Sequence, residues 1–231
     1  MLYILFLILL LVCSIVIICF MPKFKNTRLT NTILVLLTVI PYLALMLIIY
    51  LDVGANDWNF TNTLPVANVS PFMFFTLPIF FVLPQTIKKY YLVLIALLSV
   101  GMVLSPTFSC IYNTVINYKF HAHFLLNYIS HFSLFLLGIY LVKSKQVELN
   151  TKNCLIGASI IIGAALVMML LNVIFDTAFF GLSLNGKHNI YNNVLVENSY
   201  LSALIYFIGL IGIMVLGFLF HKLINKNKKE L

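Results

Sequence analysis

The chain has 231 residues, of which 62% are hydrophobic and only 9% are charged, and its mean hydropathy is +1.08. Because a water-soluble domain carries about 25% charged residues, this composition excludes an ordinary soluble protein. The net charge of +8 comes from short basic clusters between apolar runs, whereas a nucleic-acid-binding surface needs a continuous basic patch. We therefore predict an all-α integral protein of the cell membrane and no nucleic-acid partner.

A helix that crosses the hydrocarbon core needs about 20 mostly apolar residues. The first such stretch has no basic residues before it, so we interpret it as a retained span and not as a signal peptide. The third contains Pro71, Pro78 and Pro84, so we expect it to be kinked, or short and partly re-entrant. The stretches that qualify as spans are residues 2–21, 31–51, 69–86, 90–108, 122–142, 154–175 and 199–221.

Basic residues give an independent test of this count, because cytoplasmic loops are rich in Lys and Arg. Twelve of the 14 basic residues lie in alternate connections: Lys23, Lys25, Arg28, Lys88, Lys89, Lys143, Lys145, Lys152, Lys222, Lys226, Lys228 and Lys229. This segregation predicts one polytopic bundle of seven transmembrane helices over residues 1–231. Its N-terminus is then outside, and its short basic tail, residues 222–231, is cytoplasmic.

The fifth span carries polar residues on one face, which is costly in a membrane and often marks a functional site. His123, Asn127 and His131 follow at i, i+4 and i+8, with Ser130 beside them. Because this span begins outside, His131 is expected on the order of 12–15 Å below the outer surface. Its imidazole can act as an acid, a base or a ligand, or it can be a structural hydrogen-bonding group between helices. The sequence leaves both interpretations open.

Other polar residues also fall in the outer halves of their spans, whereas the inner halves are almost purely aliphatic or aromatic. We expect an outer polar pocket, with the candidate lining residues Asn68, Ser70, Asn127, His131 and Asn172 and two further binding candidates, Asp176 and Ser202. Small residues let membrane helices approach closely. We expect such contacts at Ser159 with Gly163 and at Gly209 with Gly212. No metal-ligand or nucleotide-binding motif is present, so we predict no cofactor.

Several short motifs, in order, resemble the YwaF family of bacterial integral membrane proteins over roughly residues 30–220. They are Leu64-Pro65, Asn68-Val69-Ser70-Pro71, Ser105-Pro106, Ser130-His131 and Asn172. That family is similar to eukaryotic membrane acyltransferases that remodel ether phospholipids. The resemblance implies a catalytic cysteine at the start of span three and a catalytic histidine in span five. His131 matches the histidine, but Ala67 or Val69 stands where the cysteine is expected.

Two functional hypotheses follow. In the first, the chain is a lipid-facing protein of YwaF type, which is either degenerate or an acyltransferase-like enzyme with His131 as the base and Ser70 as the nucleophile. A serine needs a well-placed base to act in this way. In the second, the chain is a non-catalytic binding or transport component for a small substrate. Its expected partners are membrane lipid and, in the second case, another membrane protein.

Overall fold

The computed structural model describes residues 26–53, 69–117, 122–175, 177, 179–182 and 199–226. In this part of the chain all regular structure is helical, as predicted. The elements are α2 (Thr27–Val53), α4 (Val69–Thr76), η2 (Leu77–Phe81), α5 (Gln85–Asn117), α6 (Ala122–Lys143), α7 (Thr151–Phe175), η3 (Phe179–Gly181) and α8 (Ser199–Lys226). Five of these helices, α2, α5, α6, α7 and α8, are long and apolar enough to cross a membrane. The first predicted span lies outside the described residues.

The third predicted span is broken, for the reason that its prolines suggest. Proline lacks a backbone N–H and its ring clashes with the carbonyl one turn before it. The α-helix α4 accordingly ends at Thr76, Pro78 lies in the first turn of the 3-10 helix η2, and Pro84 directly precedes α5. This segment is apolar but shorter than the five long helices. The expectation of a short, kinked segment is confirmed, whereas a full third crossing is not shown.

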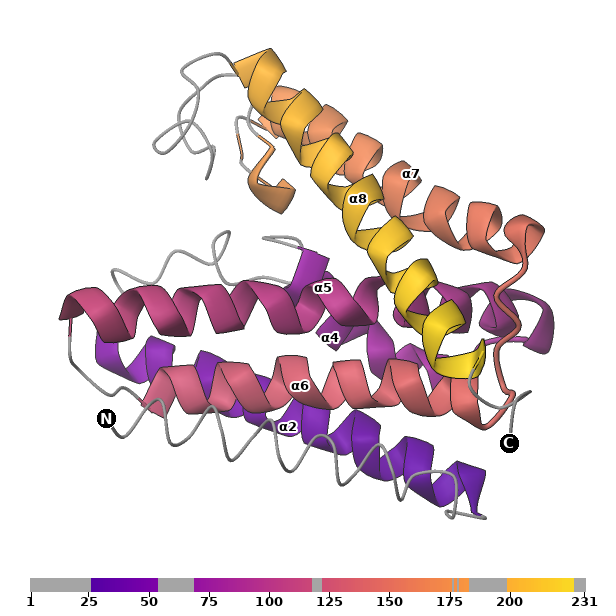
Figure 1. Ribbon diagram of the computed structural model, residues 1–231. Coiled ribbons are helices and arrows are strands. Elements are labelled where there is room, and N and C mark those ends of the chain that lie inside the picture. The colour runs from indigo at the N-terminus through magenta and orange to yellow at the C-terminus, as the bar shows by residue number, and fades with distance from the viewer. Residues whose placement is uncertain are drawn as a thin grey trace.

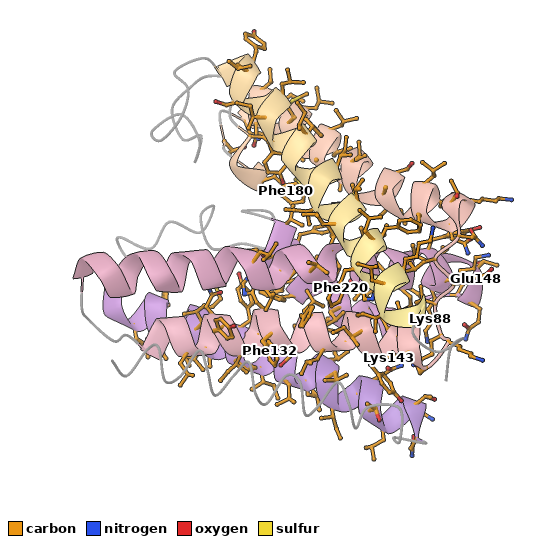
Figure 2. The ribbon with its side chains drawn as sticks, in the orientation of Figure 1. Lys88, Phe132, Lys143, Glu148, Phe180 and Phe220 are labelled. Carbon is orange, nitrogen blue, oxygen red and sulfur yellow. The ribbon has the colours of Figure 1, made fainter. Side chains whose placement is uncertain are left out.

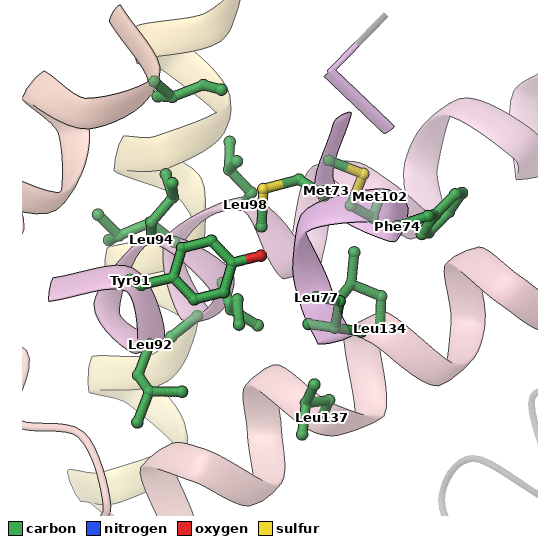
Figure 3. Close-up of a cluster of buried hydrophobic side chains, with 14 of the residues drawn as sticks. Met73, Phe74, Leu77, Tyr91, Leu92, Leu94, Leu98, Met102, Leu134 and Leu137 are labelled. Carbon is green, nitrogen blue, oxygen red and sulfur yellow. The ribbon is translucent and has the colours of Figure 1, made fainter. Parts of the chain in front are cut away.

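Helices α5 and α6 form the centre of the bundle (Figure 1). Helix α6 contacts α2, and α5 contacts α6, α7 and α8. Of the apolar window of α6, 78% is buried, against 17% for α7, so the outer helices expose most of their apolar surface. Residues 91–99 of α5 are all buried. Figure 3 shows part of this core, where Leu98 of α5 lies beside Met73 of α4.

Glycines lie where α6 and α8 come close to α5. A Cβ atom added at Gly138 of α6 would overlap the side chain of Ser99, and one added at Gly217 of α8 would overlap the carbonyl oxygen of Leu97. Small residues allow helices in membranes to pack closely because no side chain separates the backbones. These two glycines therefore fix how near α6 and α8 lie to α5.

The close contacts predicted at other small residues are not found among the described residues. No described atom lies within 4 Å of a Cβ added at Gly163, Gly209 or Gly212. Ser159 is exposed, and its hydroxyl donates to the carbonyl oxygen of Leu155 in its own helix. A pair of small residues shows that another helix could pack closely on that face, but it does not show which helix does so.

The described basic side chains gather at one end of the bundle, which we call the basic end. Helix α2 begins there with Arg28, and Figure 2 shows Lys88 and Lys143 at this same end. The amide of Asn31 donates to Gln146 Oε1 at 2.7 Å and so ties the start of α2 to the connection after α6. Alternate helix ends thus carry the charge, as the sequence predicts. Which side of a membrane the basic end occupies stays a prediction.

Candidate functional site

The short helix α4 joins the central helices around the candidate residue His131. Phe74 of α4 is buried, and its ring lies between two neighbours. Its centroid is 4.9 Å from that of the His131 ring of α6, edge to face, and 4.7 Å from that of the Tyr42 ring of α2. Edge-to-face contacts between rings are favourable because the positive edge of one meets the negative face of the other. The imidazole is therefore held by packing on an aromatic side chain.

His131 is held by a hydrogen bond within its own helix as well. Its Nδ1 lies 2.8 Å from the carbonyl oxygen of Asn127, one turn earlier, and only 6% of the residue is exposed. A carbonyl oxygen can only accept, so Nδ1 carries the proton and donates. Nε2 is then the atom with the lone pair, and it makes no hydrogen bond within the described part of the chain. His131 thus presents one open acceptor in a largely apolar setting.

Ser70 does not direct its hydroxyl to His131. The hydroxyl donates to Met102 Sδ of α5 at 3.3 Å, and a thioether is a weak acceptor. Among the described residues no hydrogen bond joins Ser70 to His131. A serine nucleophile needs a base within about 2.6–3.2 Å that takes its proton. In this arrangement neither a base nor a strong acceptor activates Ser70.

Asn127 and Ser130, the neighbours of His131 on the predicted polar stripe, bond to their own helix. The carbonyl of Asn127 accepts from His131, and the Ser130 hydroxyl donates to the carbonyl oxygen of Leu126 at 2.9 Å. Asn127 is half-buried, whereas Ser130 is fully buried. These residues do share one region of α6, but the Ser130 hydroxyl and the His131 imidazole both donate to backbone carbonyls of the same helix.

Asn172 closes the turn that follows α7. Its Nδ2 donates to the carbonyl oxygens of Phe179, at 2.9 Å, and Leu182. Its Oδ1 accepts from the Thr177 hydroxyl at 2.9 Å and from the Phe179 N–H at 2.6 Å. An amide has two donor hydrogens and two acceptor lone pairs, so all of its hydrogen-bonding positions are used. Asn172 shapes the chain here and has no position left for a ligand.

The turn that Asn172 closes brings an aromatic residue to α4. Phe180 has a positive φ of 57° and no exposed surface. Its ring centroid is 5.6 Å from that of Phe72 of α4, in an edge-to-face contact. A positive φ is unfavourable for a bulky residue, so the four hydrogen bonds of Asn172 and the burial of this ring hold it in place. Through this contact η3 reaches α4.

The predicted site residues are thus only partly brought together. Ser70 lies in α4 itself, and His131 packs on Phe74 of the same helix. Asn172 is connected to α4 only through the turn that places Phe180 against Phe72. Ser202 is fully buried on α8. Asn68 and Asp176 lie outside the described residues. In the described part of the chain no three potential metal ligands lie close together.

A polar cluster that the sequence did not predict lies towards the basic end, where the inner halves of the spans were expected to be almost purely apolar. His221 of α8 is 1% exposed, and its Nε2 donates to the carbonyl oxygen of Ala96 at 3.0 Å. Ser99 donates to the same oxygen at 2.8 Å and lies 3.2 Å from Nε2. Nε2 is taken up by this contact and the Ser99 side chain lies directly against Gly138, so these two groups join α5 to α8.

A signal for this cluster was present in the sequence. His221 is the last residue of the seventh predicted span, directly before the basic tail, and the predicted polar residues of that span do not include it. Comparisons with protein-family models, with curated proteins and with solved structures found no match for the chain.

Proposed function

We propose that the chain is a multi-pass protein of the cell membrane, of YwaF type, that binds a lipid around α4 and His131 without chemically transforming it. The helices compatible with crossing a membrane, the aromatic surroundings of His131 and the motif resemblance support this proposal. The open Nε2 of His131 carries it, because a neutral imidazole acceptor suits a lipid hydroxyl or amine donor. The lipid's apolar part would lie against the aromatic side chains of α4.

Ser70 is not activated as a nucleophile by any described residue, and this argues for binding over catalysis. An acyl transfer by Ser70 would require its proton to pass to His131, but the described hydrogen bonds direct that proton to Met102. The cysteine that the resemblance implies is also missing. A neutral, fixed histidine can still contribute a hydrogen bond worth about 1 kcal/mol or more to a bound molecule.

Photocrosslinking in nanodiscs tests the binding role. A phosphatidylethanolamine with a photoreactive acyl chain should label peptides from α4 and α6 in the unaltered protein. His131→Ala should reduce this labelling several-fold, and His131→Gln should keep part of it because an amide oxygen can replace the acceptor. Ser130→Ala is the matched control: it removes a buried polar group from the same helix, but one that bonds only to its own backbone.

Two results would contradict the proposal. Labelling of α4 and α6 that is unchanged in His131→Ala, in a variant that keeps its melting temperature, would exclude His131 from the binding site. Release of fatty acid from phospholipid by the unaltered protein, lost in His131→Ala, would show that the chain is an enzyme after all. Phospholipid hydrolysis is measured on the same nanodiscs.

A further inference from the structure

A cavity lies at the basic end, and His131 is not among the residues that line it. Its volume is about 350 Å³, within the usual range for small-ligand sites of roughly 300–1,000 Å³. It is formed where the connection from α6 enters α7 and where α8 ends, two segments that lie at the same end of the bundle in Figure 1. The lining residues are Leu149, Asn150, Thr151, Phe218, His221 and Lys222.

The wall on the α7 side offers unpaired backbone donors. Asn150 caps the helix: its Oδ1 accepts from the Asn153 N–H at 2.8 Å, and its carbonyl accepts from the Cys154 N–H at 3.0 Å. The amides of Thr151 and Lys152 precede these bonds, and the first amides of a helix have no acceptor within it. Helix N-termini attract anions because their free N–H groups and the helix dipole are positive there. Thr151 is itself a lining residue.

The opposite wall supplies a cation and a buried ring. Both Lys222 and His221 line the cavity. Lys222 is exposed, whereas only 1% of the surface of His221 is exposed. Since His221 Nε2 donates to the carbonyl oxygen of Ala96, Nδ1 is an acceptor, and it has no partner among the described residues. Glu148 is the one acidic residue whose side chain the structure describes, and it does not line the cavity. The cavity therefore combines positive charge and free N–H donors with one acceptor.

The surface beside the cavity is apolar. Leu155 lies one helical turn after Thr151 and is 64% exposed, and Leu223 follows Lys222 and is 68% exposed. A ligand with a charged head in the cavity could thus lay acyl chains along α7 and α8 without burying charge in hydrocarbon. A free phosphate compound would use the head site alone.

We propose that this cavity binds the phosphate of an anionic phospholipid whose headgroup also carries hydroxyls, such as phosphatidylglycerol, in the leaflet at the basic end. The phosphate contacts Lys222 and the first amides of α7, and a headgroup hydroxyl donates to His221 Nδ1. The choice of an anionic lipid follows from the excess of positive groups, and the choice of a hydroxylated one follows from the open acceptor. This site is separate from the proposed binding of lipid at His131.

Native mass spectrometry of the purified full chain, titrated with phosphatidylglycerol, tests the proposal. Lys222→Gln should weaken binding about tenfold, because a charge-assisted hydrogen bond is lost. Thr151→Pro should weaken it about threefold, since proline removes one N–H of the helix start but is well tolerated at the first helical position. Lys89→Gln is the control, because it removes the same charge from an exposed lysine at the basic end that does not line the cavity.

Three outcomes would overturn the assignment. Equal weakening by Lys222→Gln and Lys89→Gln, with none by Thr151→Pro, would show that only the overall charge of the basic end attracts the lipid. Equal affinity for phosphatidylcholine, whose headgroup has a phosphate but neither net charge nor hydroxyls, would exclude the proposed chemistry. Binding of glycerol phosphate with the same variant pattern, but not of phosphatidylglycerol, would identify a soluble phosphate as the ligand and refute the lipid. Labelling near His131 is measured separately, so this proposal and the proposed function can fail independently.

Discussion

Gly217 offers the sharpest test of the helix packing, because Gly209 on the same helix provides a matched control. A Cβ added at Gly217 would overlap the carbonyl oxygen of Leu97, which belongs to the backbone of α5 and cannot move aside as a side chain can. A Cβ added at Gly209 meets no described atom within 4 Å. The same change, Gly→Ala, should therefore have opposite effects at two positions that lie eight residues apart.

The expected magnitudes follow from two terms. Alanine is favoured over glycine within a helix by about 1 kcal/mol, and both variants gain this amount. Overpacking a tight contact costs about 1–3 kcal/mol, and only Gly217→Ala incurs this cost. Because the overlap at Gly217 involves backbone, the upper part of that range applies. We expect Gly217→Ala to destabilise the protein by about 1–2 kcal/mol and Gly209→Ala to stabilise it by up to about 1 kcal/mol.

Unfolding in mixed micelles with increasing denaturing detergent measures both free energies of unfolding. The unaltered protein and the two variants are compared at the same protein and lipid concentrations. Equal effects of the two substitutions would refute the reasoning, because helix propensity alone would then explain them. A destabilising Gly209→Ala would indicate that this face of α8 contacts another chain or a part of this chain outside the described residues.

Two further predictions concern buried polar contacts. Asn172→Leu keeps most of the side-chain volume but leaves the Phe179 N–H without its acceptor, at a cost of about 1–3 kcal/mol. Hydrogen exchange followed by mass spectrometry should then show faster exchange in peptides that contain Phe179. Unchanged exchange in these peptides would contradict the role of Asn172 in the turn. His221→Phe keeps a ring in place but loses the bond to the Ala96 carbonyl, which still accepts from Ser99, so detergent unfolding should show a loss of about 0.6 kcal/mol and no more than about 1.7 kcal/mol.

The long helices could be predicted because a membrane requires segments of a certain length and hydropathy. Both properties can be read from the sequence without knowing how the helices pack. The span predicted at residues 31–51 corresponds to α2 (Thr27–Val53), and the span predicted at 199–221 corresponds to α8 (Ser199–Lys226). Each observed helix is therefore longer than the apolar stretch from which it was predicted. Polar and basic residues continue these helices past the hydrocarbon core. The predicted span 90–108 ends near Ser105-Pro106, yet α5 continues through Pro106 to Asn117. A proline in a membrane helix is tolerated when neighbours compensate, and the sequence does not show those neighbours.

The candidate site was less predictable, because a polar residue in a membrane helix can be satisfied in several ways. The i, i+4 spacing of Asn127 and His131 suggested two side chains on one face, but the observed bond uses the backbone carbonyl of Asn127. Asn172 was placed in a pocket from its depth alone, whereas its partners, Phe179 and Leu182, follow it in a turn that hydropathy does not reveal. The spacing of residues predicts the helix face on which a polar side chain lies, but not the group with which that side chain forms a hydrogen bond.

The contrast between His131 and His221 shows how burial and hydrogen bonding together distinguish two histidines of similar chemistry. Both are at least nine-tenths buried, and each uses one ring nitrogen to donate to a backbone carbonyl. His221 donates to another helix, so its first task is to join α8 to α5, and only its second nitrogen can contribute to the cavity at the basic end. His131 donates within its own helix and joins no helices by that bond. Its burial must therefore be compensated by packing on Phe74 and, in our proposal, by the molecule that Nε2 binds.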